Sequence, residues 1–372
     1  LGGQSVWATD GTLDARPKVL ATTGMDTTSI FHDLSTGAND AVSVIATLLA
    51  AADAISQVDT SSLPQQIAFL LAQADEWGYA GTRRFVQDLD SFQCSNAVDS
   101  SVSHPGLPQC LDPVYPTTLF ASLGTENITA VIGVDQVGVV NRGGTDEDSP
   151  YKLFVHGLEG SQATVGDVLA ASTGADNAQV VKSSQFALPP VGAGVFAQAR
   201  PELPVAVLAG YDAAFIDPRY HSEGDTTISV DAVTAAANVL ARSLYKLAGG
   251  ASADDVPPVN STLVSALVGC LTSSWDCDFM SSYYRSEQAN LANYLDTSWI
   301  SLRGSTTPPN YFVGVIYATQ NGLPVVQHAS SVYTRYSGTF SPSTDVVYMI
   351  PSKLEAFVRS YLMFTLGSDR NS

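Results

Sequence analysis

The sequence predicts an α/β fold in which a mostly parallel central sheet is covered by helices on both faces. Short continuous apolar runs alternate with longer segments of helical periodicity over the first 250 residues. The runs lack the alternating polar positions that are typical of a half-exposed strand. Apolar residues make up 45% of the 372 residues, which is enough for a large core. Strands that are buried on both faces need a layer of helices on each side.

The expected elements follow one another along the chain. Five apolar runs are expected strands, at residues 18–22, 66–72, 129–134, 151–155 and 205–208. Three periodic segments are expected helices, at residues 41–55, 83–89 and 230–247. The last helix is followed by Gly249-Gly250, a frequent helix stop.

Polar segments mark the loops and one boundary. Residues 95–113 are rich in Ser and Pro, residues 141–150 are polar, and residues 251–258 read as a connector. Beyond the connector the pattern changes, with an expected helix near 262–271 and an expected strand at 311–317. We therefore expect an α/β core over residues 1–250 and a C-terminal extension of the same lobe over residues 251–372.

The net charge of −19 and the pI of about 4.3 disfavour nucleic acid and anionic membrane surfaces as partners, since no Lys/Arg run offsets them. Acidity alone is otherwise typical of a solvated surface. No stretch of about 20 uncharged apolar residues is present, so we expect no transmembrane segment. No signal peptide is recognisable at the start, and we expect Leu1 to be a cut or processed end.

Cysteines and sequons favour a secreted or luminal compartment. Cys94, Cys110, Cys270 and Cys277 form two close pairs without a CxxC or Cys/His cluster, which disfavours a zinc finger. Sequons begin at Asn127 and Asn260 and mark two candidate glycosylation sites. We expect Cys94–Cys110 and Cys270–Cys277 bonds. Four cysteines allow three connectivities, and four free thiols are the alternative.

Acidic residues and one histidine cluster at expected strand ends and helix starts, where open α/β sheets place their sites. The candidates are Asp26, Asp40, Asp75, Glu76, Asp135 and His221. Each has a simpler interpretation when taken alone. Asp40 would cap the helix that follows it, Asp75 and Glu76 would be solvated loop acids, and His221 would lie on the surface. The order of the whole set is more informative than any one member.

That order resembles the co-catalytic zinc aminopeptidases, whose pattern is HxD after a strand, an Asp opening a helix, an EE pair, a strand-end Asp and a late YHxxxD. The resemblance implies two zinc ions that share one carboxylate. It matches Asp40 to the bridging ligand, Glu76 and Asp135 to the single carboxylate ligands, His221 to one histidine and Asp26 to the acid that orients the other histidine.

Two positions depart from that pattern. Gly24 stands where the first histidine ligand is expected, and Asp75 stands where the family has its general-base glutamate. Aspartate is one methylene shorter, and a base must reach its proton at roughly 2.6–3.2 Å. A working two-zinc site is therefore not expected. A single metal held by His221, Glu76 and Asp40 stays open as an alternative.

The chain resembles the nicastrin family more closely, because five sequence blocks match it in register. They are LGGQSVW at residues 1–7, DEWGYAGTRRF at 75–85 (GETWGYLGSRRF in the family form), LPP at 188–190, YHS at 220–222 and LARSLYKLAGG at 240–250. A thinner match continues through Ser274-Trp275 and IPSKLE at 350–355.

The resemblance implies the large lobe of a nicastrin ectodomain, with a degenerate aminopeptidase-like fold, no catalysis and no cofactor. It implies a luminal or extracellular position in a single-pass membrane protein, with the smaller lobe and the membrane anchor outside this chain. The implied partners are presenilin, the other γ-secretase subunits and the N-terminal ends of type I membrane proteins. Asp75 and Tyr79 are the expected contacts of a substrate N-terminus, unless they only organise their loop.

Two other functions stay open. Four retained ligand positions would suit an active or residual zinc aminopeptidase. A purely structural glycoprotein domain would keep the pocket as a relic.

Overall fold

The structure is a computed structural model. It describes residues 5–30, 35–98, 109–111, 114–115, 118–173, 177–273, 277–283, 338–341, 346–349 and 353–367. The strand expected at residues 311–317 lies outside these ranges, as do Ser274-Trp275 and the first four residues.

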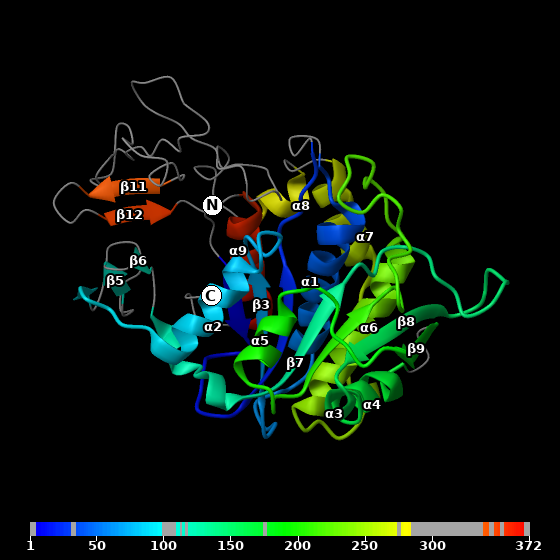
Figure 1. Cartoon of the computed structure of the whole chain (residues 1–372), viewed down its shortest axis with the longest axis horizontal. Coiled ribbons are helices and arrows are strands. Elements are labelled where there is room, and N and C mark those ends of the chain that lie inside the picture. The colour runs from blue at the N-terminus through cyan, green and yellow to red at the C-terminus, as the bar shows by residue number, and fades with distance from the viewer. Residues whose placement is uncertain are drawn as a thin grey trace.

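A seven-stranded sheet forms the centre of the fold (Figure 1). Its strand order is β1 (Val6–Thr9), β3 (Gln66–Ala72), β2 (Lys18–Gly24), β7 (Ile128–Asp135), β10 (Val205–Ala209), β8 (Tyr151–Gly157) and β9 (Ala178–Lys182). Neighbours are parallel except β1 with β3 and β8 with β10. All five expected strands are confirmed. The edge strands β1 and β9 were not expected, because β1 is short and β9 is half-exposed.

The larger helical layer covers one face of the sheet. It consists of a π-helical turn, η2 (Ala38–Val42), that runs into α1 (Ser43–Ser56), together with α4 (Val165–Ala171), α6 (Val230–Leu247), α7 (Ser261–Ser273) and α9 (Lys353–Leu366). Helix α1 packs against α6, α7 and α9. The expected helices at 41–55, 230–247 and 262–271 are thereby confirmed. The described parts of the C-terminal extension share this core, while the domain boundary at residue 250 stays a prediction.

The opposite face carries α2 (Ala80–Ser91) and α5 (Ala193–Ala199), which enclose a second apolar core (Figure 1). Helix α2 confirms the helix expected at 83–89 and is longer at both ends. The fold is therefore the three-layer arrangement that the alternating pattern predicts. Short helices α3 (Glu159–Gln162) and α8 (Asp278–Ser281) complete the described α-helices, and three 3-10 helices are also described, η3 (Leu119–Ser122), η4 (Thr125–Asn127) and η5 (Ala253–Asp255).

The expected loop at 95–113 is not wholly irregular. It contributes β4 (Ala97–Val98) and β5 (Gln109–Leu111), which form a small antiparallel sheet with β6 (Val114–Tyr115). Strands β11 (Gly338–Ser341) and β12 (Val346–Met349) form a separate hairpin pair. Both expected disulfides are present, Cys94–Cys110 and Cys270–Cys277, so all four thiols are paired.

Helix α1 is the most apolar element of the larger layer. In the described part of the chain, the helical stretch Ala38–Ser56 alone has the length and hydropathy to cross a membrane, and 94% of its apolar window is buried. Leu48, Leu49 and Ile45 have essentially no exposed surface. Its composition therefore fits the core helix of a folded domain.

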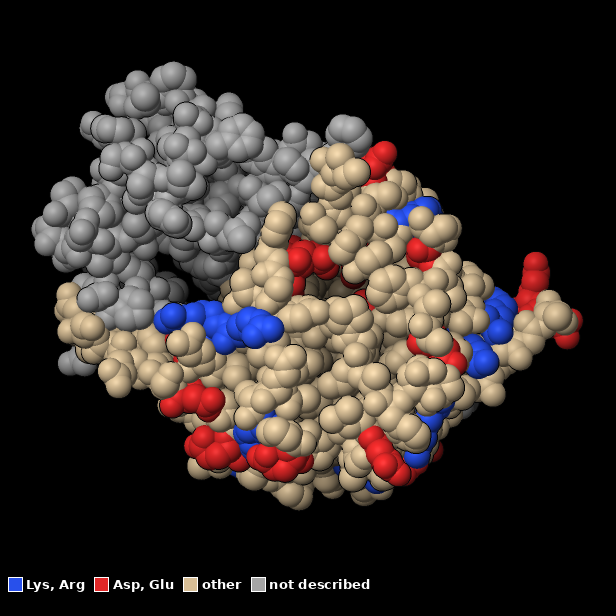
Figure 2. Space-filling model, viewed as in Figure 1, with Lys and Arg blue, Asp and Glu red and all other residues tan. Residues whose placement is uncertain are grey.

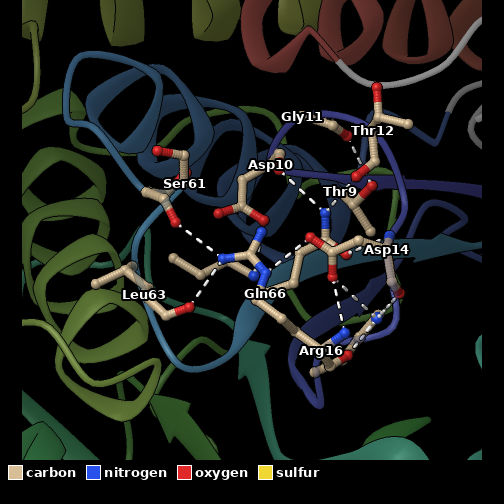
Figure 3. Close-up of polar contacts among 12 residues, drawn as sticks. Thr9, Asp10, Gly11, Thr12, Asp14, Arg16, Ser61, Leu63 and Gln66 are labelled. Atoms are coloured by element: carbon tan, nitrogen blue, oxygen red, sulfur yellow. Dashed lines mark hydrogen bonds and ion pairs between the residues drawn. The ribbon is translucent and has the colours of Figure 1, made fainter.

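A polar network closes the end of the sheet away from the site (Figure 3). The Asp10 carboxylate accepts a hydrogen bond from the backbone N–H of Ile67 at 2.8 Å, and the Gln66 amide donates to the Asp10 carbonyl at 3.1 Å. Arg16 donates to the carbonyl of Leu63 at 3.0 Å. Asp10 is 6% exposed, and burial raises the pKa of its carboxyl from 3.8 to about 6.

Candidate functional site

An acidic cavity of about 50 Å³ opens at the carboxyl ends of β2, β3 and β7. It brings together the five expected acids Asp26, Asp40, Asp75, Glu76 and Asp135. Gly24, Tyr79 and Tyr220 also line it, whereas none of the described lining residues is Lys or Arg. Figure 2 shows acidic side chains on the floor of a hollow in this face. The site is therefore a concentration of carboxylates with no Lys or Arg among its described lining residues.

Asp26 organises the loop after β3. Its two carboxylate oxygens accept hydrogen bonds from the backbone N–H groups of Asp75 at 2.9 Å and Glu76 at 3.0 Å. The side chain is 3% exposed. Asp26 thereby positions the backbone that presents Glu76.

Asp75 is fastened to the start of α2. One oxygen accepts from the backbone N–H of Thr82 at 2.9 Å and the other from the Thr82 hydroxyl at 2.7 Å. A Cβ atom on Gly192 would lie 2.1 Å from the Asp75 carboxylate, so the glycine permits this close packing. Asp75 lines the cavity, but both of its oxygens are already engaged by Thr82. Its expected contact with a substrate N-terminus stays a prediction.

Asp40 lies in the π-helical turn η2, and its contacts fix it from two sides. Its Oδ2 accepts a hydrogen bond from the Thr27 hydroxyl at 2.6 Å. Its backbone N–H donates to the carboxylate of Asp225 at 3.1 Å, as does that of Asn39 at 2.9 Å. Asp225 therefore caps this helix start, and the alternative interpretation of Asp40 as the cap is wrong.

His221 points its Nε2 atom towards two carboxylates. Nε2 lies 2.8 Å from Glu76 Oε2 and 3.6 Å from Asp40 Oδ2. These contacts are ion pairs when the imidazole is protonated, while Nε2 makes no hydrogen bond to a described residue. The imidazole stacks on Tyr220 with ring centroids 3.7 Å apart. One imidazole nitrogen and two carboxylate oxygens thus converge at one place.

Asp135 ends β7 and is held by a tyrosine. The Tyr211 hydroxyl donates a hydrogen bond to its Oδ2. Both residues are buried, at 8% and 3% exposure. Asp135 therefore contributes charge to the cavity wall, while its position is fixed by the start of the 211–220 loop.

Burial raises the pKa values of four of the acids. It raises the pKa of Asp75 and of Asp135 to about 6. Burial, then the charge of Asp75, raises the pKa of Asp26, and burial, then the charge of Glu76, raises that of Asp40. A cation that enters the cavity would favour the ionised form of these carboxylates, because an opposite charge nearby lowers a carboxyl pKa.

The donor set fits one metal ion and not two. The ligand atoms of Asp40, Glu76 and His221 all lie within 4.8 Å of one another, and carboxylate and imidazole are good zinc ligands. A second ion beside Asp135 would lack its histidine, because Gly24 has no side chain. A Cβ on Gly24 would meet Asp75 Cβ at 3.4 Å, an ordinary contact, so packing alone does not impose the glycine.

Left-handed backbone marks this site in a way that the sequence did not reveal. Five described residues other than glycine have positive φ, and four belong to the loops around the cavity: Ala74, Tyr79, Gln136 and His221. Such conformations cost about 1–3 kcal/mol each and accumulate at functional sites. Left-handed residues are thus concentrated in the loops around the cavity.

An α/β sheet that gathers these acids and one histidine at its carboxyl edge, in this order along the chain, defines an aminopeptidase-like domain. The family model of the nicastrin large lobe matches residues 17–246, and the chain belongs to the nicastrin family. Nicastrin from Arabidopsis thaliana is 29% identical over 348 residues, which cover 89% of this chain and 46% of the relative. Nicastrin from Dictyostelium purpureum is 27% identical over 286 residues, covering 74% and 43%.

A solved structure has the same fold. The crystal structure of the γ-secretase component nicastrin superposes with a TM-score of 0.72 at 21% identity, covering 98% of this chain and 56% of that one. Human nicastrin is 26% identical over 308 residues, 72% of this chain and 38% of the relative. The chain thus spans about half the length, or less, of these curated relatives.

Proposed function

We propose that this chain is the non-catalytic large lobe of a γ-secretase subunit, and that its acidic cavity binds the free N-terminus of a polypeptide substrate. The observation that carries the proposal is a cavity lined by five carboxylates and no Lys or Arg among its described lining residues. Such a cavity favours a compact cation, and an α-ammonium group is one. The solved relative is itself a γ-secretase component.

The wider assignment follows from the family. The proposed partners are presenilin and the other subunits of the complex, and the proposed ligands are the N-terminal ends of type I membrane proteins. Two disulfides suit the oxidising luminal or extracellular side of a membrane. The sequon residue Asn260 is exposed and uses only its Oδ1 to accept from the backbone N–H of Thr262 at 3.0 Å, which leaves its amide nitrogen available for a glycan.

The test compares peptides that differ only at their first atom. Fluorescent peptides with a free N-terminus are expected to bind the domain, and the same peptides with an acetylated N-terminus are not. Asp40→Asn should weaken binding of the free peptide about tenfold, whereas Glu147→Gln in an exposed loop should leave it unchanged. Equal binding of free and acetylated peptides would contradict the proposal.

A second measurement separates recognition from scaffolding. In the assembled complex, Asp40→Asn should reduce capture of substrate and leave association with presenilin intact. A loss of association with normal capture would favour the purely structural role.

A residual metal site is the second candidate, and the convergence of the His221 Nε2 atom with the carboxylates of Glu76 and Asp40 favours it. Asp40, Glu76 and His221 would hold the ion, which would supply positive charge and Lewis acidity. The position of the general base does not suit hydrolysis, because Thr82 engages both oxygens of Asp75. We therefore propose no turnover.

Metal analysis and an aminopeptidase assay decide between the candidates. One zinc ion per chain, lost in His221→Ala and kept in His156→Ala, together with no release of aniline from aminoacyl-anilides, would indicate a silent metal. Zinc with turnover would establish the enzyme. No zinc at micromolar concentration would leave the cavity to the ammonium group.

A further inference from the structure

Two adjacent arginines form an exposed cationic surface on helix α2. Arg83 and Arg84, here called the arginine pair, are the only neighbouring Lys or Arg residues in the sequence and the only basic residues of this helix. Both are exposed. Figure 2 shows the basic side chains over α2 beside the hollow with the acidic floor. Two cations thus adjoin the acidic cavity of a chain whose net charge is −19.

The stability of α2 does not explain the arginine pair. The first turn of a helix carries a partial positive charge, which disfavours cations there and favours them in the last turn. Helix α2 has the opposite arrangement, with Arg83 and Arg84 in its first half and Asp88 and Asp90 in its second. Arg84 forms an ion pair with Asp88, Nε to Oδ2 at 2.8 Å, but its side chain is still 51% exposed. The arginine pair therefore presents positive charge to solvent at a place where the helix itself does not favour it.

Arg83 is fastened to the loop that lines the acidic cavity. Its Nε donates a hydrogen bond to the carbonyl of Gly78 at 2.8 Å. The next residue, Tyr79, lines the cavity. Burial raises the pKa of the Tyr79 hydroxyl, and the charge of the nearby Arg83 opposes that shift. Among the described residues no carboxylate forms an ion pair with Arg83, so its guanidinium can accept an anion from outside the domain.

An exposed aromatic ring belongs to the same loop. Trp77 is 45% exposed. Its backbone N–H donates to the carbonyl of Ala74 at 3.3 Å, and that of Tyr79 donates to the carbonyl of Asp75 at 2.9 Å, so backbone hydrogen bonds hold the turn that presents the ring. Trp and Arg are enriched among the residues that dominate binding at interfaces. The loop and α2 together therefore offer an ammonium site, an aromatic ring and two guanidinium groups.

We infer that the arginine pair binds an acidic side chain that follows within a few residues of the free N-terminus of the bound polypeptide. The inference rests on the proposed function, because the acidic cavity takes the ammonium group and so fixes one end of the chain. Glu76 and Tyr79 line the cavity, and Gly78 between them bonds to Arg83, so a chain that leaves along this loop reaches the arginine pair. Opposite charges at the two places would set the direction and register of the bound chain.

The experiment measures binding of labelled peptides to this 372-residue chain by fluorescence anisotropy. The probes are poly-alanine hexapeptides with a fluorophore on the side chain of a C-terminal lysine, in which one position from the second to the fifth is Glu or Gln. Glu and Gln have nearly the same shape, so their difference reports charge. At one position we expect Glu to bind about threefold to tenfold more tightly than Gln, as two exposed ion pairs would give. The gain should fall below about twofold in 0.5 M NaCl, because salt screens exposed charges.

Charge variants localise the preference. Without the arginine pair the net negative charge of the chain disfavours a Glu peptide, so Arg83→Gln with Arg84→Gln should abolish or invert the gain and leave the Gln peptide within about twofold. Arg83→Lys keeps the charge and should keep part of the gain, which separates charge from loop position. Lys182→Gln removes one exposed cation from β9 and is the control with the same change in net charge as either single Arg→Gln variant. Thermal unfolding verifies that each variant is folded.

The inference and the proposed function fail in different ways. If Glu binds no better than Gln at any of the four positions, while acetylation of the N-terminus still abolishes binding, the acidic preference is overturned and the ammonium site is kept. A gain from Glu that survives in the double arginine variant would also overturn the inference. Binding that acetylation does not change would overturn the proposed function, and with it the register that places an acidic side chain on the arginine pair.

Discussion

The carboxylate of Asp225 holds the backbone of Asp40 from 185 residues further along the chain. It accepts from the N–H groups of Asp40 and Asn39, and it is 1% exposed. The helix start that carries one acid of the cavity is therefore capped by another part of the chain. The loop that carries Asp225 and the helix start that carries Asp40 are therefore linked directly.

Asp225→Asn should destabilise the domain by about 1–3 kcal/mol, since an amide N–H₂ would face a backbone donor in a buried position. Ligand affinity should fall as well, because Asp40 would lose its support. Urea unfolding measures the first effect, and peptide binding measures the second. The exposed Asp231→Asn should stay within about 0.5 kcal/mol of the parent. An equally small effect at Asp225 would show that the cap is dispensable.

Gly192 and Gly194 form a matched pair for testing the packing around Asp75. A Cβ on Gly192 would meet Asp75 Oδ2 at 2.1 Å and Thr82 Oγ1 at 2.6 Å, so Gly192→Ala should cost about 1–3 kcal/mol. Gly194 has no atom within 4 Å of its Cβ position and lies in α5, so Gly194→Ala should gain about 0.5–1 kcal/mol. Chemical denaturation measures both. The same sign for both variants would contradict the described packing.

Ala74 adopts a φ of 66°, which favours glycine, and the nicastrin form GETWGY has glycine at this place. Ala74→Gly should therefore raise stability by about 0.5–1 kcal/mol, because relief of left-handed strain exceeds the added chain entropy. Ala170→Gly inside α4 should lower stability by about 1 kcal/mol. Differential scanning calorimetry distinguishes the two signs. Destabilisation by Ala74→Gly would mean that the methyl group is needed in the loop.

Asp10 provides a pH test away from the cavity. Its pKa is about 6 in the folded state against 3.8 for the free group, so its folded state retains a proton that the unfolded chain releases. The stability from this residue is present below about pH 4 and is lost as the pH rises through 6. It amounts to at most about 3 kcal/mol, at 1.36 kcal/mol for each pKa unit.

Asp10→Asn should remove that loss, since Asn has no proton to release and can still accept from Ile67. The stability of the variant relative to the parent should rise between pH 4 and pH 7, as measured by urea midpoints at each pH. Asp146→Asn, at an exposed loop position, should give a flat difference. A flat difference at Asp10 too would place its pKa near the ordinary value.

The core of the fold could be predicted because its strands are buried on both faces. A nearly continuous apolar run such as Gln66–Ala72 is typical of a strand at the centre of a sheet that helices cover on both faces. The edge strand β1 has only four residues, and β9 alternates between half-buried and exposed positions, so neither gives that signal. Helix α9 was not expected because Lys353, Glu355 and Arg359 interrupt its apolar pattern in the sequence.

The sequence predicts which residues form the site, but not the hydrogen bonds that those residues make. The ends of parallel strands meet at one edge, so the candidate acids were expected to lie together. The bond between Thr82 and Asp75 and the left-handed conformation of Tyr79 depend on how the loop turns into α2, which local residue preferences do not specify. Asp225 is the last residue of the YHxxxD pattern that begins at Tyr220. Its spacing from His221 was the only sequence signal for its contact with the helix start at Asp40.

The apolarity of α1 has a consequence for biosynthesis. During translation this segment leaves the ribosome long before α6, its main covering helix, which begins only at Val230. Until then a stretch with the hydropathy of a bilayer-spanning helix lacks its native cover. The nascent chain is thus most exposed to aggregation and to mistaken membrane insertion in this interval, and a chaperone that binds Ala38–Ser56 would protect it.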